Sequence, residues 1–452
     1  MEALIFIGLL VTCALLGLPM LYAVVAGLVV FFVFGLRRGI PAGKLVGVMI
    51  PGFRRSLIVV VVILMVGVMS AAWRASGLMA LLVVGGLSLI YAPLFLLFTF
   101  LLSAGFAFII GSSLGAASVM GILLFTLGNA GNVATLPMVG AILSGIYFGD
   151  RASFLSSSAL LVSSLCQVNH KRHLRNMQRS AVIPFIASAI LYAILCLFFP
   201  FNASRAREIL ALREFFELGN PLLWLPLVFV LLPAFTRLTL PYSIAMSTVT
   251  AFAITLTVQG IDAGTALRDL LFGYSRQIDH PQLKLLYGGG LFSMVKPMLV
   301  VFFSGALPPL LHELGTLAPY QDRLGRMAVR VNPFAAAFVS GILTCAIGCS
   351  QTLAVFLQVP LLEKVYPEQG KEEKALAISN SAILLSALVP WNIAMAAPLA
   401  IIGASPLGGI FAFYLYLTPI IALLGEGKNC RARPESVSSS TTGYQEDKIK
   451  QD

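Results

Sequence analysis

A carboxylate stands within an otherwise apolar stretch of the chain, in the sequence Gly149-Asp150-Arg151-Ala152-Ser153. A charged side chain at the centre of a membrane helix costs about 2.5–3.5 kcal/mol on insertion scales, so it usually faces a cavity, a partner or an ion. A carboxylate that holds either a proton or a cation, but not both, can exchange one for the other. We therefore expect Asp150 to bind a proton or a cation, with an ion pair between Asp150 and Arg151 as the alternative.

Small polar residues interrupt the apolar sequence around Asp150 and again in the second half of the chain. Those expected to supply neutral oxygens or hydrogen bonds to a shared site are Ser112, Ser113, Ser153, Ser350, Gln351 and Asn392. Glycine beside hydroxyl or amide residues is typical of a discontinuous helix, whose freed backbone groups must find partners. Tight helix packing through small residues is the alternative. Trp391, between Pro390 and Asn392, is expected to form a wall of the site.

One lysine also falls in an apolar segment, in the sequence Gly-Gly-Gly-Leu-Phe-Ser-Met-Val-Lys-Pro that ends at Pro297. Lys296 is either a fixed positive charge in the site or a side chain that snorkels to the membrane interface.

Residues 111–115 also match the Gly-x-Ser-x-Gly pattern of serine hydrolases. That pattern needs a strand–turn–helix context and a histidine base. The four histidines, however, fall in loops or at the ends of predicted spans: His170, His173, His280 and His312. The six cysteines show no disulfide or metal-site spacing, and no zinc-protease or P-loop pattern is present. We expect no enzyme, no cofactor and no resident metal.

The elements that position these residues must be membrane helices. Hydrophobic residues make up 58% of the 452 residues, charged residues make up 11% and the mean hydropathy is +0.93. Apolar stretches recur along the chain, which predicts an all-α polytopic membrane protein with roughly ten to thirteen membrane segments, some of them broken. The net charge of +11 is explained by lysine and arginine in cytoplasmic loops and does not indicate nucleic-acid binding.

One pattern occurs twice. Gly-Ile-Pro-Ala-Gly at 39–43 reappears as Gly-Ile-Asp-Ala-Gly at 260–264, and Gly-Ser-Ser at 111–113 reappears as Gly-Cys-Ser at 348–350. The first copy's loop, 37–55, contains only basic charges, whereas 260–284 balances basic and acidic ones. Because the positive-inside rule would place these loops on opposite sides, the duplication predicts two inverted repeats.

The expected organisation has four parts. They are a first membrane repeat at 1–168, a connecting basic loop, span and external loop at 169–220, a second inverted repeat at 221–424, and a disordered tail at 425–452. Both termini are expected in the cytoplasm, with the chain in the cytoplasmic (inner) membrane. Assembly with further copies of the chain stays open.

At these residues the chain resembles the NhaC-type Na⁺/H⁺ antiporter family. The segments that resemble it are Gly-Ser-Ser-Leu-Gly at 111–115, the stretch 140–153 with Gly149-Asp150, 259–274, 289–294, and Leu-Val-Pro-Trp-Asn at 388–392. The similarity extends over nearly the whole chain up to about residue 424 and implies sodium- or proton-coupled exchange. The family also includes relatives that exchange organic anions or transport amino acids.

This chain departs from the family pattern at several positions. A second acid that commonly follows the Gly-Asp element is absent from Ser156-Ser157-Ser158-Ala159, and an acidic pair before Pro-Trp-Asn is replaced by Ser379 and Asn380. The expected site has therefore lost negative charge, and each lost carboxylate weakens cation binding.

The sequence accordingly predicts a secondary antiporter that exchanges Na⁺ for H⁺ at Asp150. The alternative is proton- or sodium-coupled transport of a small organic anion or amino acid, with Lys296 or Arg151 as the countercharge. A channel, or a membrane scaffold without transport, ranks behind both.

Overall fold

The computed structural model describes residues 8, 12–13, 20–89, 91–202, 204, 208–236, 238–275, 281–284, 286–315, 326, 332–348, 350–366 and 368–430. These residues form helices and turns, and their one β-bridge joins Tyr274 and Gly288. The all-α fold that the composition predicts is confirmed.

Six helical stretches in the described part are long and apolar enough to cross a membrane. They are Ala42–Ala75, Ala92–Ile110, Ser113–Ala130, His170–Phe198, Leu240–Thr257 and Phe292–Leu311. A seventh span forms if Lys371–Leu388 and Ile393–Ile402, which meet at a bend of 47°, are one unit. Five shorter apolar helices accompany them: Leu21–Arg37, Pro221–Pro233, Pro333–Ile347, Gln351–Leu361 and Phe413–Gly425. The chain is therefore a multi-pass membrane protein.

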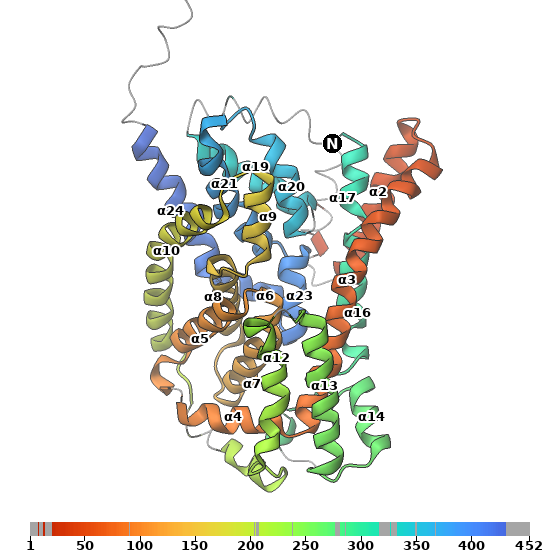
Figure 1. Ribbon diagram of the computed structural model, residues 1–452, viewed down its shortest axis with the longest axis vertical. Coiled ribbons are helices and arrows are strands. Elements are labelled where there is room, and N and C mark those ends of the chain that lie inside the picture. The colour runs from red at the N-terminus through yellow and green to blue at the C-terminus, as the bar shows by residue number, and fades with distance from the viewer. Residues whose placement is uncertain are drawn as a thin grey trace, which may run out of the picture.

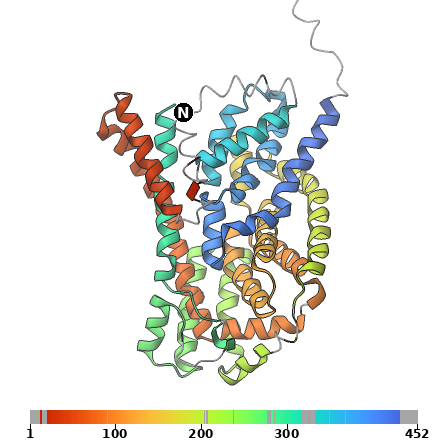
Figure 2. The same ribbon diagram turned by 180° about the vertical axis from the view of Figure 1, so that it is seen from behind.

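The helices are stacked along the long axis of the molecule between two ends (Figure 1). We call "basic end" the end that holds the turn between α2 (Met20–Arg37) and α3 (Ala42–Ala75) and the start of α10 (His170–Phe198). The "opposite end" holds α4 (Leu78–Leu89) and α14 (Ala263–Phe272). The 34-residue α3 runs between the two ends (Figures 1 and 2).

The remaining helices divide between the two halves of the molecule (Figure 1). The half at the basic end contains α9 (Ser157–Leu165), α19 (Pro333–Gly348), α20 (Gln351–Leu361) and α21 (Lys371–Asn380). The half at the opposite end contains α5 (Phe95–Ile110), α7 (Ile122–Ala130), α12 (Leu225–Phe235) and α13 (Leu240–Thr257). Along the outside, α16 (Val295–Ser304) and α17 (Leu307–Glu313) pack on α3, and α24 (Phe413–Cys430) packs on α10.

Two helix–turn–helix units contain the repeated glycine and serine residues. In the first, α5 ends at Gly111, whose φ of 71° is left-handed, and Ser112 caps α6 (Ser113–Ala116) by accepting from the Gly115 N–H at 3.2 Å. The chain continues through a π-helical turn, Ala117–Gly121, into α7. In the second, α19 and α20 pack against each other.

The second unit restarts in the same way as the first. Ser350 has an extended backbone (φ −148°) like that of Ser112 (φ −147°), and its hydroxyl accepts from the Leu353 N–H at 3.3 Å. Both restarts therefore use a serine N-cap, which satisfies one of the backbone donors that a helix leaves free at its start.

Two further runs of consecutive helices, which we call broken paths, are interrupted by short non-helical segments. One passes from α8 (Thr135–Ala152) through 153–156 into α9, where the Ser156 hydroxyl accepts from the Ala159 N–H at 3.1 Å. The other passes from α21 through α22 (Ala382–Leu385) to α23 (Ile393–Ile402), which Asn392 caps by accepting from the Ala394 N–H at 3.0 Å. The predicted breaks at 149–153 and at Pro-Trp-Asn are thus real ends of helices.

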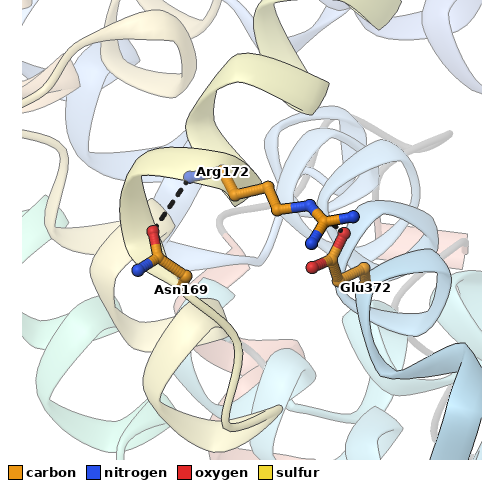
Figure 3. A network of polar contacts seen from close by, with 3 residues as sticks. All are labelled: Asn169, Arg172 and Glu372. Carbon is orange, nitrogen blue, oxygen red and sulfur yellow. Dashed lines mark hydrogen bonds and ion pairs between the residues drawn. The ribbon is translucent and has the colours of Figure 1, made fainter.

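An ion pair at the basic end joins α10 to the path that begins with α21. The Arg172 Nε lies 2.9 Å from a carboxylate oxygen of Glu372, which links the start of α10 to the start of α21 (Figure 3). Asn169 caps α10 by accepting from the Arg172 backbone N–H at 3.2 Å. Because both partners are partly exposed, the pair adds little stability and chiefly fixes where the two helices meet.

The structure alters one expected boundary. The segment 425–452 is predicted to be a disordered tail, but α24 continues to Cys430. Residues 431–452 lie outside the described part of the chain.

Glycines let α8 lie directly on α5. A Cβ atom added at Gly145 would come within 2.6 Å of the Phe100 carbonyl oxygen, and one at Gly149 would come within 2.4 Å of the Ala104 carbonyl oxygen. Such distances are far below van der Waals contact, so the two backbones touch without side chains between them. This packing fixes the position of the last turn of α8, where Asp150 lies.

We predict that Gly145→Ala lowers the thermal midpoint of the detergent-solubilised protein, measured by tryptophan fluorescence. The added methyl group overpacks the α5–α8 contact at a cost of about 1–3 kcal/mol. Gly105→Ala on α5 is the matched control, because nothing lies within 4 Å of its added Cβ, and it should leave the midpoint unchanged or slightly raised. Equal midpoints for Gly145→Ala and wild type would contradict the direct packing.

Candidate ion-binding site

Asp150 lies in the last turn of α8 and is 95% buried, with a fractional exposure of 5%. Its hydrogen-bonding neighbours are Ser113, through the backbone N–H and the hydroxyl, and Ser156, through the hydroxyl. The Oδ1 atom has no partner among the described residues. The carboxylate is therefore buried beside two serine hydroxyls and keeps one oxygen without a hydrogen bond.

The breaks in the helices bring these groups together. Ser113 is the first residue of α6, where backbone N–H groups are free and the helix dipole is positive, so a carboxylate is favoured there. Gly111 packs directly on the next break, since an added Cβ would lie 2.4 Å from the Leu155 Cβ. The start of α6 is thus held against 153–156, and Asp150 lies between them.

Arg151 does not pair with Asp150. Its side chain is buried, with a fractional exposure of 1%, and no carboxylate of the described chain lies within ion-pair distance of it. The guanidinium donates instead to four neutral oxygens: the Met177 carbonyl at 3.3 Å, the Tyr414 hydroxyl at 3.0 Å, the Ser180 hydroxyl at 2.9 Å and the Asn380 side chain. The alternative of an Asp150–Arg151 ion pair is therefore wrong.

A second polar cluster forms where α19 and α20 meet the break before α23. The Asn392 amide donates to the Cys345 carbonyl at 3.1 Å, and the Trp391 indole donates to the Ala346 carbonyl at 2.8 Å. On α20, the Gln351 amide donates to the Ile383 carbonyl at 2.9 Å. These side chains satisfy carbonyls that the helix ends leave free.

Tyr147 connects the two clusters. It lies three residues before Asp150 on α8, and its hydroxyl donates to the Ala394 carbonyl in the first turn of α23. The broken paths α8–α9 and α21–α23 are therefore in contact with each other.

The residues selected from sequence accordingly fall into three groups. Ser113 contacts Asp150, while Ser112 caps α6 and the buried Ser153 accepts from the Leu155 N–H at 3.2 Å within the neighbouring break. Ser350, Gln351, Trp391 and Asn392 belong to the second cluster. Lys296 is exposed near the start of α16 and bonds to neither cluster.

Several residues of the site are absent from the sequence-based selection. Ser156 contacts Asp150, Tyr147 links the clusters, and Asn380 accepts from Arg151. Beside them, the buried His173 imidazole lies 3.2 Å from the Ser379 hydroxyl. Only Ser156 had a local signal, because a serine just before an apolar helical segment is a typical N-cap.

The arrangement provides one carboxylate surrounded by neutral oxygens. Within the described residues, no three His, Cys, Asp or Glu side chains gather as they would around a multivalent metal ion. One carboxylate with hydroxyl ligands can hold a single proton or a monovalent cation without leaving a large net charge.

Comparisons with known proteins give transporters as relatives of this chain. The profile of the Na⁺/H⁺ antiporter family matches residues 145–424. A malate-2H⁺/Na⁺-lactate antiporter of Bacillus subtilis is 26% identical over 390 residues, which cover 83% of this chain and 82% of that protein. The Na⁺/H⁺ antiporter NhaC of Alkalihalophilus pseudofirmus is 24% identical, with 88% and 87% covered, and NhaC of Bacillus subtilis is 24% identical, with 83% and 85% covered.

We predict that Asn380→Asp raises the thermal midpoint of the purified protein. A carboxylate would neutralise the buried Arg151 guanidinium, which now has only neutral acceptors, and this attraction is expected to exceed the cost of burying the new charge. Asn380→Leu is the opposing control: it removes the acceptor and should lower the midpoint, at a cost of about 1–3 kcal/mol. A lower midpoint for Asn380→Asp would show that Arg151 does not need an anionic partner.

Proposed function

Since the chain belongs to the Na⁺/H⁺ antiporter family, we propose that it is a secondary antiporter of the cytoplasmic membrane that exchanges Na⁺ for H⁺ at Asp150. The observation that supports this most directly is the buried carboxylate with an unpartnered Oδ1 and two serine neighbours. A group of this kind is unstable without a bound proton or cation.

In this proposal Asp150 alternates between two neutral states. In one, the carboxyl group holds a proton; in the other, Na⁺ lies on the ionised carboxylate. The hydroxyls of Ser113 and Ser156 suit both states, because a hydroxyl can donate to a carboxylate or turn its lone pairs toward a cation. Each turnover would then move one ion in each direction, and a site with neither ion would carry the full cost of a buried charge.

Alternating access would arise from the broken helical paths. The α5–α7 unit lies in the half at the opposite end, the α19–α20 unit lies in the half at the basic end, and both restart at a serine N-cap. This similarity supports the proposal of two inverted repeats at 1–168 and 221–424. We further propose that both termini lie in the cytoplasm. Movement of one repeat against the other would open the site to each side in turn.

Exchange of a small organic anion is the second candidate. The guanidinium of Arg151 is buried and donates to Asn380 and other neutral groups. A fixed positive charge therefore lies next in sequence to the Asp150 carboxylate. The similarity to a malate-2H⁺/Na⁺-lactate antiporter favours the same alternative. In that case the anion would approach Arg151, and Asp150 would carry the coupling proton.

We predict that proteoliposomes with wild-type protein show lumenal pH changes when Na⁺ or Li⁺ is added, and that Asp150→Asn abolishes them. The neutral asparagine side chain takes up no proton and does not attract Na⁺ as a carboxylate does. Transport of both the proton and Na⁺ is therefore lost. Asp262→Asn is the matched control. Asp262 caps α14 outside the spans, where hydrogen bonds from Thr265 hold the pKa of its carboxyl below its usual range, and asparagine also caps helices.

Two results would contradict this assignment. Exchange that persists in Asp150→Asn would place the coupling group elsewhere. Proton movement that follows only organic anions, and never Na⁺ or Li⁺, would replace the primary proposal by the second candidate.

We also predict that Ser113→Ala and Ser156→Ala each raise the Na⁺ concentration for half-maximal exchange by about tenfold, because a lost ligand oxygen costs on the order of 1.4 kcal/mol. The maximal rate should change less than this concentration. Ser164→Ala, on α9 but outside the site, should leave both unchanged. Unchanged half-maximal concentrations in both site variants would remove the serines from cation binding.

A further inference from the structure

A cavity of about 430 Å³ lies away from Asp150, between the end of α3, α7, the end of α23 and the turn 288–290. The residues that form it are Ser70, Arg74, Ile122, Phe125, Thr126, Asn129, Lys284, Tyr287, Gly288, Gly289, Ser293, Met294 and Ala400 to Gly403. Its volume is in the range of sites for small molecules. No function assigned above uses these residues.

The charged residues that line the cavity in the described part of the chain are both basic. They are Arg74 and Lys284, and no aspartate or glutamate of that part lines it. Arg74 donates through Nη1 to the Ser70 carbonyl at 3.1 Å and to the Ser70 hydroxyl, while its Nε is buried without a partner. No carboxylate of the described residues pairs with Arg74. A largely buried guanidinium with only neutral partners favours an added anion.

A glycine turn holds this guanidinium at the cavity wall. Gly288, Gly289 and Gly290 all have left-handed backbones, with φ of 118°, 75° and 87°. A Cβ at Gly289 would lie 3.1 Å from the Arg74 Nη1 and 2.7 Å from the Ala71 backbone nitrogen. The absence of side chains in this turn therefore lets the arginine lie close against the backbone.

The rest of the lining is suited to an organic ligand. The lining also contains the apolar side chains of Ile122, Phe125, Met294, Ile401 and Ile402, which we call the apolar wall. An inorganic anion has no apolar part that could pack against these side chains. A small organic acid has both a charged group for the arginine and a carbon skeleton for the apolar wall. A guanidinium matches a carboxylate with two parallel hydrogen bonds.

We propose that this cavity binds a small organic carboxylate, with Arg74 on the carboxylate, Lys284 at the rim and the apolar wall on the carbon skeleton. The α23 helix connects the cavity to the central site, because Ile402 lines the cavity and the Ala394 carbonyl binds Tyr147. The inference rests on the residues of the cavity and does not depend on which ion Asp150 exchanges.

The test is isothermal titration of the purified full-length protein in detergent with succinate. We expect saturable binding to wild type that Arg74→Gln and Lys284→Gln each weaken at least tenfold, with an intermediate loss for Arg74→Lys. Arg55→Gln is the matched control, because Arg55 is exposed on the same helix and does not line the cavity. Lys284 is also exposed, so its variant tests the proposal even if Arg74→Gln does not fold.

Three outcomes would overturn the proposal. They are an absence of saturable binding to wild type, binding that is equally strong in Arg74→Gln and Lys284→Gln, and displacement of succinate by inorganic phosphate at equal concentration, which would indicate a general anion site. Asp150→Asn separates this proposal from the exchange mechanism. That variant should bind succinate as wild type does, even where ion exchange is lost or was never present.

Discussion

The need to satisfy backbone groups inside the bilayer is the constraint on which the rest of the structure depends. A broken helix exposes N–H and carbonyl groups where no water replaces the lost partners. This chain satisfies them with short polar side chains: Ser112, Ser156, Ser350 and Asn392 each cap a restarting helix. The same side chains surround the centre of the molecule. The polar groups at the centre of the molecule are therefore largely the groups that make the breaks tolerable.

A second property of the centre is the separation of its two charges. Asp150 and Arg151 are neighbours in sequence on α8, but the carboxylate faces Ser113 and Ser156 while the guanidinium faces Asn380 and Ser180. Had they paired, the two charges would have neutralised each other, and the proposed exchange at Asp150 would have no unpaired carboxylate to use. Keeping them apart costs stability, and the neutral hydrogen bonds to Arg151 offset part of that cost.

The sequence is sufficient to predict the all-α membrane fold, the helix breaks and a buried carboxylate at Asp150, because these follow from local composition. The glycine at 111 and the Pro-Trp-Asn element mark the ends of helices whatever the rest of the chain does. The contacts of Arg151 with Asn380 and of Tyr147 with Ala394 could not be predicted in the same way. Their partners lie more than two hundred residues apart in sequence, and only tertiary packing brings them together. The cavity at Arg74 could not be predicted from the sequence for the same reason, since residues of α3, α7 and α23 line it together.

The direct contact of α8 on α5 also limits how this protein can evolve. Gly145 and Gly149 admit no larger side chain, because the carbonyls of Phe100 and Ala104 occupy the space. In an evolving sequence, the polar residues around Asp150 can be replaced one at a time with a modest loss of stability. The two glycines cannot be replaced unless α5 and α8 both shift. The polar neighbours of Asp150 can therefore change by single mutations, whereas the packed helix pair that positions the carboxylate is inherited as a unit.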